Sequence, residues 1–365
     1  MDSLSSAPPP PPHHHIYVTF CSKELGQSTT FSNCIARFDP SNNTWNHVSS
    51  IKGLPQNHVL KDFAMTSIGD FIYIIGGRLC RKERIISSDY SDSNDFSETD
   101  VQVFSTVYRY NVKSNQWSNC APLSVPRYNF ACTVCDNKIY VAGGQYELAS
   151  CRSTPSAEVY DPSANEWTQL PDMRIVRCKC VGVTWRGKVH VIGGFVEGCD
   201  LDQSIAYVGR CSVEVYDEER GQWDLVKGMW QLDVPPNQIV ALEGKLFSSG
   251  DCLNAWKGHI EAYDGKINLW NVVEGSQMKS LCCTLSGGED NDSQNMKRLY
   301  VTMALIGSYL YFLAGYKVVG DAWSTVTMVH RFDTFATENA WTSFDPSREE
   351  GRRELCSHCC VVTHI

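Results

Sequence analysis

The stretch KVHVIGGF (188–195) is a short apolar run that ends at two glycines, Gly193 and Gly194. Glycine adopts backbone angles closed to other residues, so this pattern is typical of a buried strand that ends where the chain leaves its sheet. Four further stretches have this form, two with the full glycine pair and two with one glycine: FIYIIGGR (71–78), KIYVAGGQ (138–145), KLFSSGDC (245–252) and YLYFLAGY (309–316). The recurrence predicts an internal repeat.

A pair of aromatic residues marks each unit of this repeat. A Tyr or Phe is followed by a tryptophan, seven positions on in five pairs and nine positions on in the last. Turn-forming residues such as DPSANE (161–166) lie between the two aromatics. The six pairs are Phe38/Trp45, Tyr110/Trp117, Tyr160/Trp167, Tyr216/Trp223, Tyr263/Trp270 and Phe332/Trp341. The sequence therefore predicts six units.

Each unit contains four expected strands, here named a to d. In the third unit they are NFACTVC (129–135), KIYVAG (138–143), SAEVYD (156–161) and EWTQL (166–170). Alternating apolar residues separated by turn formers indicate strands, and the Asp136-Asn137 pair predicts a two-residue hairpin between strands a and b. One four-stranded sheet cannot bury its own faces, so the units must stack, and radial stacking of such sheets is a propeller.

The glycine pair, the Tyr-Asp that follows it and the tryptophan seven residues later resemble the kelch repeat, whose period is about 50 residues. The resemblance covers residues 16–365 and implies an all-β fold, a six-bladed kelch β-propeller. The pattern is weaker in units five and six, which keep one glycine, and in unit one, which has none. The expected blades end near Trp45, Trp117, Trp167, Trp223, Trp270 and Trp341.

The two ends of the sequence predict how the first blade is completed. Unit one opens with its strand b, IYVTF (16–20), and lacks a strand a, whereas the sequence ends with an extra strand, LCSHCCVVTHI (355–365). We therefore expect the last strand to complete the first blade, and removal of the last ten residues to unfold or aggregate the protein. Residues 1–15, with five consecutive prolines and three histidines, are expected to be a disordered leader.

Composition and charge disfavour several classes of function. The net charge of −9 and the lack of a basic stripe disfavour nucleic acid as a partner. No apolar run approaches the roughly 18 residues of a membrane span, and no secretory signal is visible, so we expect no membrane partner and a cytoplasmic or nuclear location. The 17 cysteines are then expected to be buried free thiols, with loop residues Cys80, Cys199 and Cys252 as candidates for redox sensing.

No motif for a metal, a cofactor or catalysis emerges from the sequence. Cys132 and Cys135 lie three apart in an expected strand and so point to opposite faces, which disfavours zinc binding. No nucleophile elbow, phosphate-binding loop or histidine pair at ligand spacing is found. We expect no enzyme, no cofactor and no metal. The alternative is a small-molecule enzyme of the epimerase or oxidase kind, because such enzymes occur on kelch-type propellers.

Function is expected on the side of the propeller where the b–c and d–a connections lie, here called the loop face. Connections on the other side are short and alike, whereas those of the loop face are long and varied, as is typical of a recognition surface. The long connections are residues 78–104, 145–155, 195–211, 272–299, 316–325 and 342–354.

Two kinds of side chain on the loop face are candidates for partner binding. Arginines at the start of strands a suit acidic peptide side chains, and aromatic residues after strands b suit anchoring. The arginines are Arg127, Arg177 and Arg352, and the aromatic residues are Tyr146, Phe195, Trp256, Tyr316 and Trp323. The same loop face carries Ser97-Glu-Thr-Asp100, which has the form of an acidophilic kinase site and predicts regulation by phosphorylation of Ser97.

The resemblance implies a protein–protein interaction module that recognises a partner peptide, either as a scaffold or as a substrate-recognition component of a ubiquitin ligase. Kelch adaptors of ubiquitin ligases carry a BTB or F-box segment. Fifteen residues before the first expected strand are too few for either. A link to a ligase is therefore expected to require a partner chain that supplies this segment.

Overall fold

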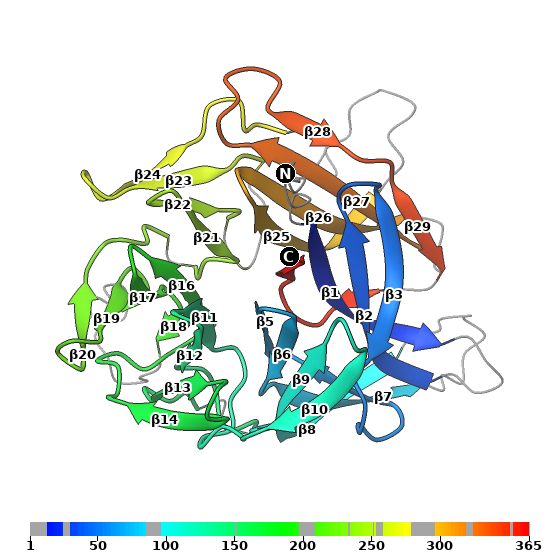
Figure 1. Cartoon of the computed structure of the whole chain (residues 1–365), viewed down its shortest axis with the longest axis horizontal. Coiled ribbons are helices and arrows are strands. Elements are labelled where there is room, and N and C mark those ends of the chain that lie inside the picture. The colour runs from blue at the N-terminus through cyan, green and yellow to red at the C-terminus, as the bar shows by residue number, and fades with distance from the viewer. Residues whose placement is uncertain are drawn as a thin grey trace, which may run out of the picture.

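The computed structural model describes residues 13–24, 30–84, 96–149, 152–196, 209–232, 234–250, 252, 258–278, 296–318, 324–350 and 353–364. Within these ranges the chain forms six antiparallel sheets of four or five strands and two smaller sheets. The six larger sheets are arranged around a common centre, which confirms the predicted β-propeller (Figure 1).

The strands follow the predicted order in each blade. Blade 1 contains β1 (His13–Glu24), β2 (Thr30–Asp39), β3 (Thr44–Ser50), β30 (Glu354–Leu355) and β31 (Cys360–His364). Blade 2 contains β5 (Ala64–Ile68), β6 (Phe71–Ile75), β9 (Val107–Asn111) and β10 (Gln116–Cys120), and is extended by β4 (His58–Lys61), β7 (Arg78–Arg84) and β8 (Phe96–Val103). Blade 3 contains β11 (Ala131–Cys135), β12 (Lys138–Ala142), β13 (Ala157–Asp161) and β14 (Glu166–Leu170).

The other three blades repeat this order. Blade 4 contains β16 (Val181–Trp185), β17 (Lys188–Ile192), β19 (Val213–Asp217) and β20 (Gln222–Val226), beside the small sheet of β15 (Arg177–Cys178) and β18 (Phe195–Val196). Blade 5 contains β21 (Ile239–Leu242), β22 (Lys245–Ser248), β23 (Glu261–Asp264) and β24 (Leu269–Val272). Blade 6 contains β25 (Met296–Ile306), β26 (Tyr309–Val318), β27 (Ser324–Asp333), β28 (Trp341–Ser343) and β29 (Ser347–Glu350). Strands a lie near the centre and strands d at the periphery (Figure 1).

The repeated aromatic pair joins strands c and d and then joins neighbouring blades. In blade 3, Tyr160 and Trp167 are directly paired across β13 and β14, with ring centroids 5.0 Å apart. The Tyr160 hydroxyl donates to Asn165 Oδ1 at 2.8 Å, and Trp167 Nε1 donates to the Ala121 carbonyl at 2.8 Å, in the connection from blade 2. The spacing between the two aromatic residues recurs because the tyrosine ring packs against the tryptophan within the blade, while the tryptophan N–H donates a hydrogen bond to the connection from the preceding blade.

The glycine pair allows two backbones to approach the end of strand b. Gly143 and Gly144 have φ of 69° and 89°, in the left-handed region that favours glycine. A Cβ on Gly143 would lie 2.6 Å from the Arg177 carbonyl of the next blade, and a Cβ on Gly144 would lie 2.6 Å from Phe130 Cβ of the same blade. The Gly144 N–H donates to the Arg177 carbonyl at 2.9 Å. The pair thus permits the contact that joins one blade to the next.

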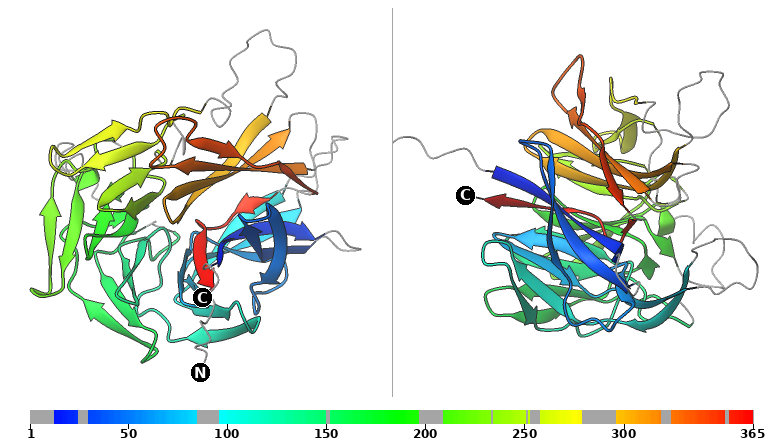
Figure 2. Two further views of the ribbon diagram at one scale, coloured as in Figure 1. Left: turned by 45° about the horizontal axis from the view of Figure 1, so that its top comes forward. Right: turned by 90° about the vertical axis from the view of Figure 1, so that its right-hand side faces the viewer.

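The first and last strands share one sheet. β31 pairs with β1 from Tyr17↔Cys360 to His13↔His364, and β30 pairs with β1 at Phe20 and Cys21. Figure 2 shows these C-terminal strands in red beside the blue first strand. The prediction that the C-terminal strand completes the first blade is confirmed. The boundary of the expected leader is wrong at residues 13–15, which belong to β1; residues 1–12 lie outside the described part of the chain.

The loop face is asymmetric, since strands extend beyond the blades on one half of it. β7 and β8 pair with each other within 78–104, which the sequence analysis predicted only as a long connection. Blades 1 and 6 likewise have strands b and c of ten or more residues, whereas those of blades 3 and 5 have four or five. In blades 1, 2 and 6 the segments that follow strand b and precede strand c continue to pair with each other, so these blades are longer than blades 3 and 5. The polar composition of 78–104 did not indicate this pairing.

Candidate functional site

Arg127 is buried and binds its own blade. Its exposed fraction is 0%, and its guanidinium donates to the Gly143 and Ser156 carbonyls, each at 2.9 Å, and to Ser156 Oγ at 3.0 Å. It also forms an ion pair with Glu158 at 2.8 Å, and Glu158 is equally buried. Burial lowers the pKa of Arg127, and Glu158 opposes this shift. The prediction that Arg127 binds a partner is wrong, because the side chain does not reach the surface.

Arg177 repeats this arrangement in the next blade. It is 0% exposed, donates to the Gly193 carbonyl at 2.7 Å and to Ser212 Oγ at 2.9 Å, and lies 3.4 Å from Glu214. The backbone N–H groups of Arg174 and Ile175 donate to the same carboxylate. The prediction for Arg177 as a surface residue is therefore also wrong.

The sequence carries a signal for this structural role of the two arginines. Glu158 and Glu214 stand two residues before the aromatic residue of strand c in the blades whose strands a follow Arg127 and Arg177. In a β-strand, residues two apart share a face, so each glutamate lies on the same face of its blade as the buried tyrosine. A repeated Arg and Glu at matched positions predicts a buried pair rather than two independent surface charges.

The aromatic candidates differ in their exposure. Tyr146 is exposed at 37%, on the connection that follows β12. Phe195 is half-buried in β18, where it pairs with Cys178 of β15. Tyr316 is 0% exposed within β26, so the prediction that it anchors a partner is wrong. Arg352, Trp256 and Trp323 lie outside the described residues.

The mouth of the central channel is formed by the residues that precede strands a. Asp62, Asn129 and Lys179 have left-handed φ of 53°, 53° and 51°. The Asp62 N–H donates to the Cys356 carbonyl at 3.1 Å, the Asn129 N–H to the Asp62 carbonyl at 3.0 Å and the Lys179 N–H to the Asn129 carbonyl at 2.7 Å. A chain of backbone hydrogen bonds therefore joins blades 1 to 4 at the mouth.

Among the residues joined by these backbone hydrogen bonds, Lys179 is a candidate for partner binding that the sequence analysis did not predict. Asn and Asp tolerate the left-handed region, whereas a lysine there is uncommon and its backbone is strained. Its side chain is exposed, so it places a positive charge at the channel mouth. The sequence signal for this position was that Lys179 stands at the same place in its repeat as Asp62 and Asn129 do in theirs.

Behind this mouth lies a cavity of about 430 Å³ lined by strands a and by the residues that precede them. Four of its cysteines are Cys132, Cys180, Cys356 and Cys359. Burial raises the pKa of each of these thiols, to about 12 for Cys132, Cys180 and Cys359. Burial lowers the pKa of His358, which also lines the cavity, to about 4. At neutral pH these five side chains are uncharged, which suits binding better than nucleophilic catalysis.

A charged cluster joins the blade 2 extension to the C-terminal strand. Lys61 lies 2.5 Å from both Glu98 and Glu354, and Lys82 lies 2.8 Å from Glu98 and 2.9 Å from Glu354. These four residues, here called the latch, belong to β4, β7, β8 and β30. Partial burial alone would raise the pKa of Glu98, but hydrogen bonds from the two lysines outweigh it and lower this pKa to about 2.

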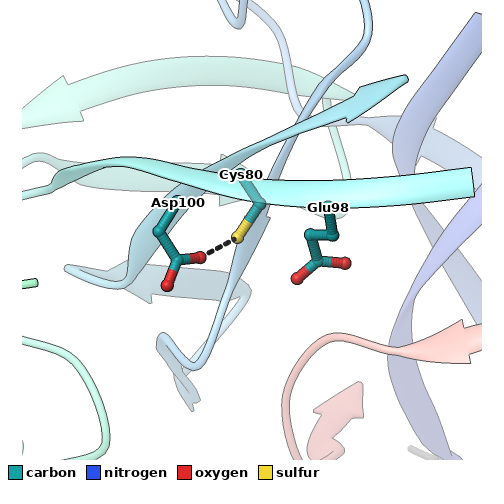
Figure 3. A group of neighbouring side chains, drawn as sticks. All are labelled: Cys80, Glu98 and Asp100. Carbon is teal, nitrogen blue, oxygen red and sulfur yellow. Dashed lines mark hydrogen bonds between the residues drawn. The ribbon is translucent and has the colours of Figure 1, made fainter.

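Cys80, Glu98 and Asp100 lie close enough to suggest a cation site (Figure 3). The Cys80 thiol donates to Asp100 Oδ1 at 3.3 Å, and burial raises the pKa of Cys80 well above its usual value. Glu98 is paired with the latch lysines, and Asp100 is paired with Arg78. A cation would have to displace these basic side chains and deprotonate the thiol, so the cluster fits ion pairs better than a metal. The same burial makes Cys80 a poor redox thiolate, contrary to the prediction.

The other two redox candidates and Ser97 have different positions. Cys252 is half-buried and lines the central cavity, while Cys199 lies outside the described residues. Ser97 is exposed on β8, and its Oγ donates to the Glu83 carbonyl at 3.4 Å. Asp100, the acidic residue three positions on, is paired with Arg78. Phosphorylation of Ser97 stays a prediction.

Comparison with known proteins adds evidence from outside the molecule. Residues 126–174 match the model of the Kelch motif. The chain is 30% identical over 193 residues to an F-box/kelch-repeat protein of Arabidopsis thaliana, covering 53% of this chain and 45% of the relative. It is 26% identical over 284 residues to Kelch-like protein 15 of Homo sapiens, covering 73% of this chain and 41% of the relative.

Another relative has a similar span. The F-box/kelch-repeat protein SKIP30 of Arabidopsis thaliana is 30% identical over 236 residues, which cover 62% of this chain and 58% of the relative. The chain thus spans less than two thirds of each of these relatives. In the part of the chain that the structure describes, no helix is long and apolar enough to cross a membrane.

Proposed function

Because this chain is a kelch-repeat protein, we propose that it binds another protein on its loop face. The observation that carries the proposal is the arrangement at the channel mouth, where the exposed and strained Lys179 stands above a cavity of about 430 Å³. Strained residues at a cavity mouth are common at binding sites. Exposed Tyr146 belongs to a connection on the same face and supplies an aromatic contact.

We further propose that the bound partner is a client of a ubiquitin ligase. Two of the similar proteins are named F-box/kelch-repeat proteins, and another is named Kelch repeat and BTB domain-containing protein 12. The chain in hand would supply the recognition surface of such an assembly, and scaffolding of a complex without a ligase is the other form of the proposal. A cytoplasmic or nuclear location belongs to the same proposal, since cysteines such as Cys132, Cys180 and Cys359 are free thiols, which persist in reducing compartments.

The second candidate is binding or conversion of a small molecule in the channel. The cavity volume lies in the range of about 300–1,000 Å³ that is typical of ligand pockets. His358, neutral at physiological pH, could accept or donate a hydrogen bond there. Screening metabolites for a rise in melting temperature, with His358→Phe as the control, tests this candidate.

Affinity capture with mass spectrometry tests the main proposal. The variant Lys179→Asn/Tyr146→Ala removes the charge and the exposed ring, and the fold should be kept because Asn129 occupies the same position with the same backbone angle. The control, Lys266→Asn, changes an exposed lysine in the c–d turn of blade 5, on the other side of the propeller. We expect a partner held by the wild type and the control but lost from the double variant. Equal capture by all three proteins would contradict the proposal.

A further inference from the structure

The tyrosine of strand c makes the same hydrogen bond in three blades. Tyr110, Tyr160 and Tyr263 each donate from the hydroxyl to the side-chain oxygen of an asparagine five residues later, at 2.8 Å in every case. Each asparagine stands in a c–d turn and has a left-handed φ of 53° or 54°. The asparagines are Asn115, Asn165 and Asn268. The hydroxyl of this tyrosine therefore points toward the c–d turn of its own blade.

Blade 4 has the tyrosine but lacks the asparagine. The ring centroid of Tyr216 lies 5.1 Å from that of Trp223, compared with 5.0 Å for the equivalent pair in blade 3. Five residues after Tyr216 the chain has Gly221, whose φ of 57° keeps the turn but which offers no side-chain acceptor. Tyr216 is 8% exposed, and its hydroxyl has no hydrogen-bond partner within the described part of the chain. Because buried tyrosine hydroxyls usually have a partner, this one is available to a ligand.

A pocket of about 250 Å³ lies beside this turn, where the neighbouring blades 3 and 4 meet (Figure 1). Tyr216 lines it from β19 and Tyr140 lines it from β12, with their ring centroids 6.3 Å apart. Tyr140 is 5% exposed, and among the described residues its hydroxyl also lacks a hydrogen-bond partner. Two buried aromatic rings with unused hydroxyl groups therefore line one pocket.

The c–d turn of blade 4 makes this pocket negatively charged. Glu218 and Glu219 line it, are exposed, and form no ion pair with any residue that the structure describes. The basic side chains nearby are already engaged, since Lys188 lies 2.8 Å and Arg220 lies 3.1 Å from Asp217. The charge of Asp217 is thus balanced, whereas the charges of Glu218 and Glu219 are not.

The hydrogen-bonding groups of the pocket suit a cation that donates hydrogen bonds. Burial, followed by the charge of Glu218, raises the pKa of Tyr140 to about 12, so this hydroxyl is neutral at pH 7 and can accept through its oxygen. The Cys135 thiol already has acceptors in Asp136 Oδ2 at 3.6 Å and the Gly187 carbonyl at 3.8 Å. The volume lies below the roughly 300 Å³ at which pockets for drug-sized ligands begin, which favours a group no larger than a side chain.

We propose that this pocket binds a primary ammonium group, with Glu218 as the counter-charge and the hydroxyl oxygens of Tyr140 and Tyr216 as acceptors. An ammonium group has three donors, which match one carboxylate and two hydroxyls, and the two rings attract it through cation–π contact. The pocket lies at a c–d turn, opposite the loop face, so its ligand is separate from the partner proposed for that face. A lysine side chain and a free alkylamine both carry this group.

The experiment titrates the full chain, labelled with ¹³C at tyrosine Cε, and follows the tyrosine signals by NMR. The probes are n-butylammonium chloride and the peptide acetyl-GGKGG-amide; n-butanol and the same peptide with norleucine in place of lysine are the uncharged controls. The variants Tyr140→Phe and Tyr216→Phe identify the two signals. We expect both amines, and neither control, to shift them. A dissociation constant at least about tenfold lower for the peptide identifies a lysine of a protein as the ligand, and any other order identifies a free amine.

Variants of the c–d turn test the pocket itself. Gly221→Asn restores the asparagine of the other blades, and Asn165 has nearly the same backbone angle, so the fold should be kept. Because the new amide should accept the hydrogen bond of the Tyr216 hydroxyl, we expect n-butylammonium to bind at least about tenfold more weakly. Glu218→Gln should weaken binding about fivefold at low salt, whereas Glu338→Gln, the same change at an exposed position between β27 and β28, should have no effect.

Two results would overturn the proposal. One is an affinity for n-butylammonium that is unchanged in Gly221→Asn, since the Tyr216 hydroxyl would then have no part in binding. The other is equal weakening by Glu218→Gln and Glu338→Gln, or equal shifts from charged and uncharged probes, which would show only general attraction. None of these results bears on the loop face, whose test uses Lys179→Asn/Tyr146→Ala.

Discussion

The buried pair of Arg127 and Glu158 gives a sharp prediction about stability. Arg127→Met keeps much of the side-chain volume but removes five hydrogen bonds, to three carbonyls, one hydroxyl and one carboxylate. It also leaves the Glu158 carboxylate buried without its counter-charge, although backbone N–H groups of the preceding connection still donate to it. Removing one partner of a buried ion pair costs about 3–5 kcal/mol, so we expect a loss of that size in the free energy of unfolding.

Guanidinium denaturation, followed by tryptophan fluorescence, measures this loss. Glu158→Gln and the double variant complete a thermodynamic cycle, in which we expect a coupling free energy of about 1–3 kcal/mol because the two side chains touch. Arg81→Met is the control: Arg81 and its partner Glu83 are both about half-exposed, so loss of this surface ion pair should leave the denaturation midpoint unchanged.

The result that would refute the reasoning is specific. The reasoning would be refuted if the free energy of unfolding of Arg127→Met lay within about 1 kcal/mol of the wild-type value while the variant failed to bind the partner. Arg127 would then act at a surface. A destabilised protein that still binds its partner below its melting temperature would support the structural role.

Three further outcomes are expected. Gly143→Ala should destabilise the protein by more than about 2 kcal/mol in the same denaturation assay, because the new Cβ meets the Arg177 carbonyl, whereas Gly187→Ala should cost only the backbone strain of about 1–2 kcal/mol, since nothing lies within 4 Å of its Cβ. The pKa of Glu98 is lowered in the folded state, so its stabilisation is complete above its unfolded pKa and is lost as pH falls from about 4.5 to about 2; Glu98→Gln should flatten this part of the stability profile, and an unchanged slope would contradict the latch. Deleting residues 356–365 removes β31 and exposes β1, so the truncated protein should be unfolded or aggregated by circular dichroism and gel filtration, and a folded monomer would contradict the role of β31 in blade 1.

The sequence was sufficient for the fold because its signals are local and repeated. The spacing of Tyr160 and Trp167 reflects one hairpin, and the glycine pair reflects one contact between neighbouring blades, so six copies define the register. The pairing of β31 with β1 was also predictable, because a missing strand a at one end and a surplus strand at the other have one simple solution.

The site was less predictable because burial depends on contacts between blades. Arg127 and Arg177 are charged residues at connections, where solvent exposure is the usual outcome, and only their matched glutamates could have indicated burial. The β7–β8 hairpin was missed because acidic and serine-rich sequences usually indicate solvated loops. The pairing that orders it comes from β4 and from the latch, whose members Lys61 and Glu354 lie far apart in the sequence.

The central claim is that the loop face binds a protein partner, and hydrogen exchange of the isolated complex tests it most directly. Once a partner has been captured, exchange of the complex is compared with that of the free protein along the whole chain. The account predicts slower exchange around Tyr146 and Lys179, and no change in the turns at 136–137, 186–187 and 265–268 on the other side. Protection confined to those turns, or to the peripheral strands alone, would contradict it.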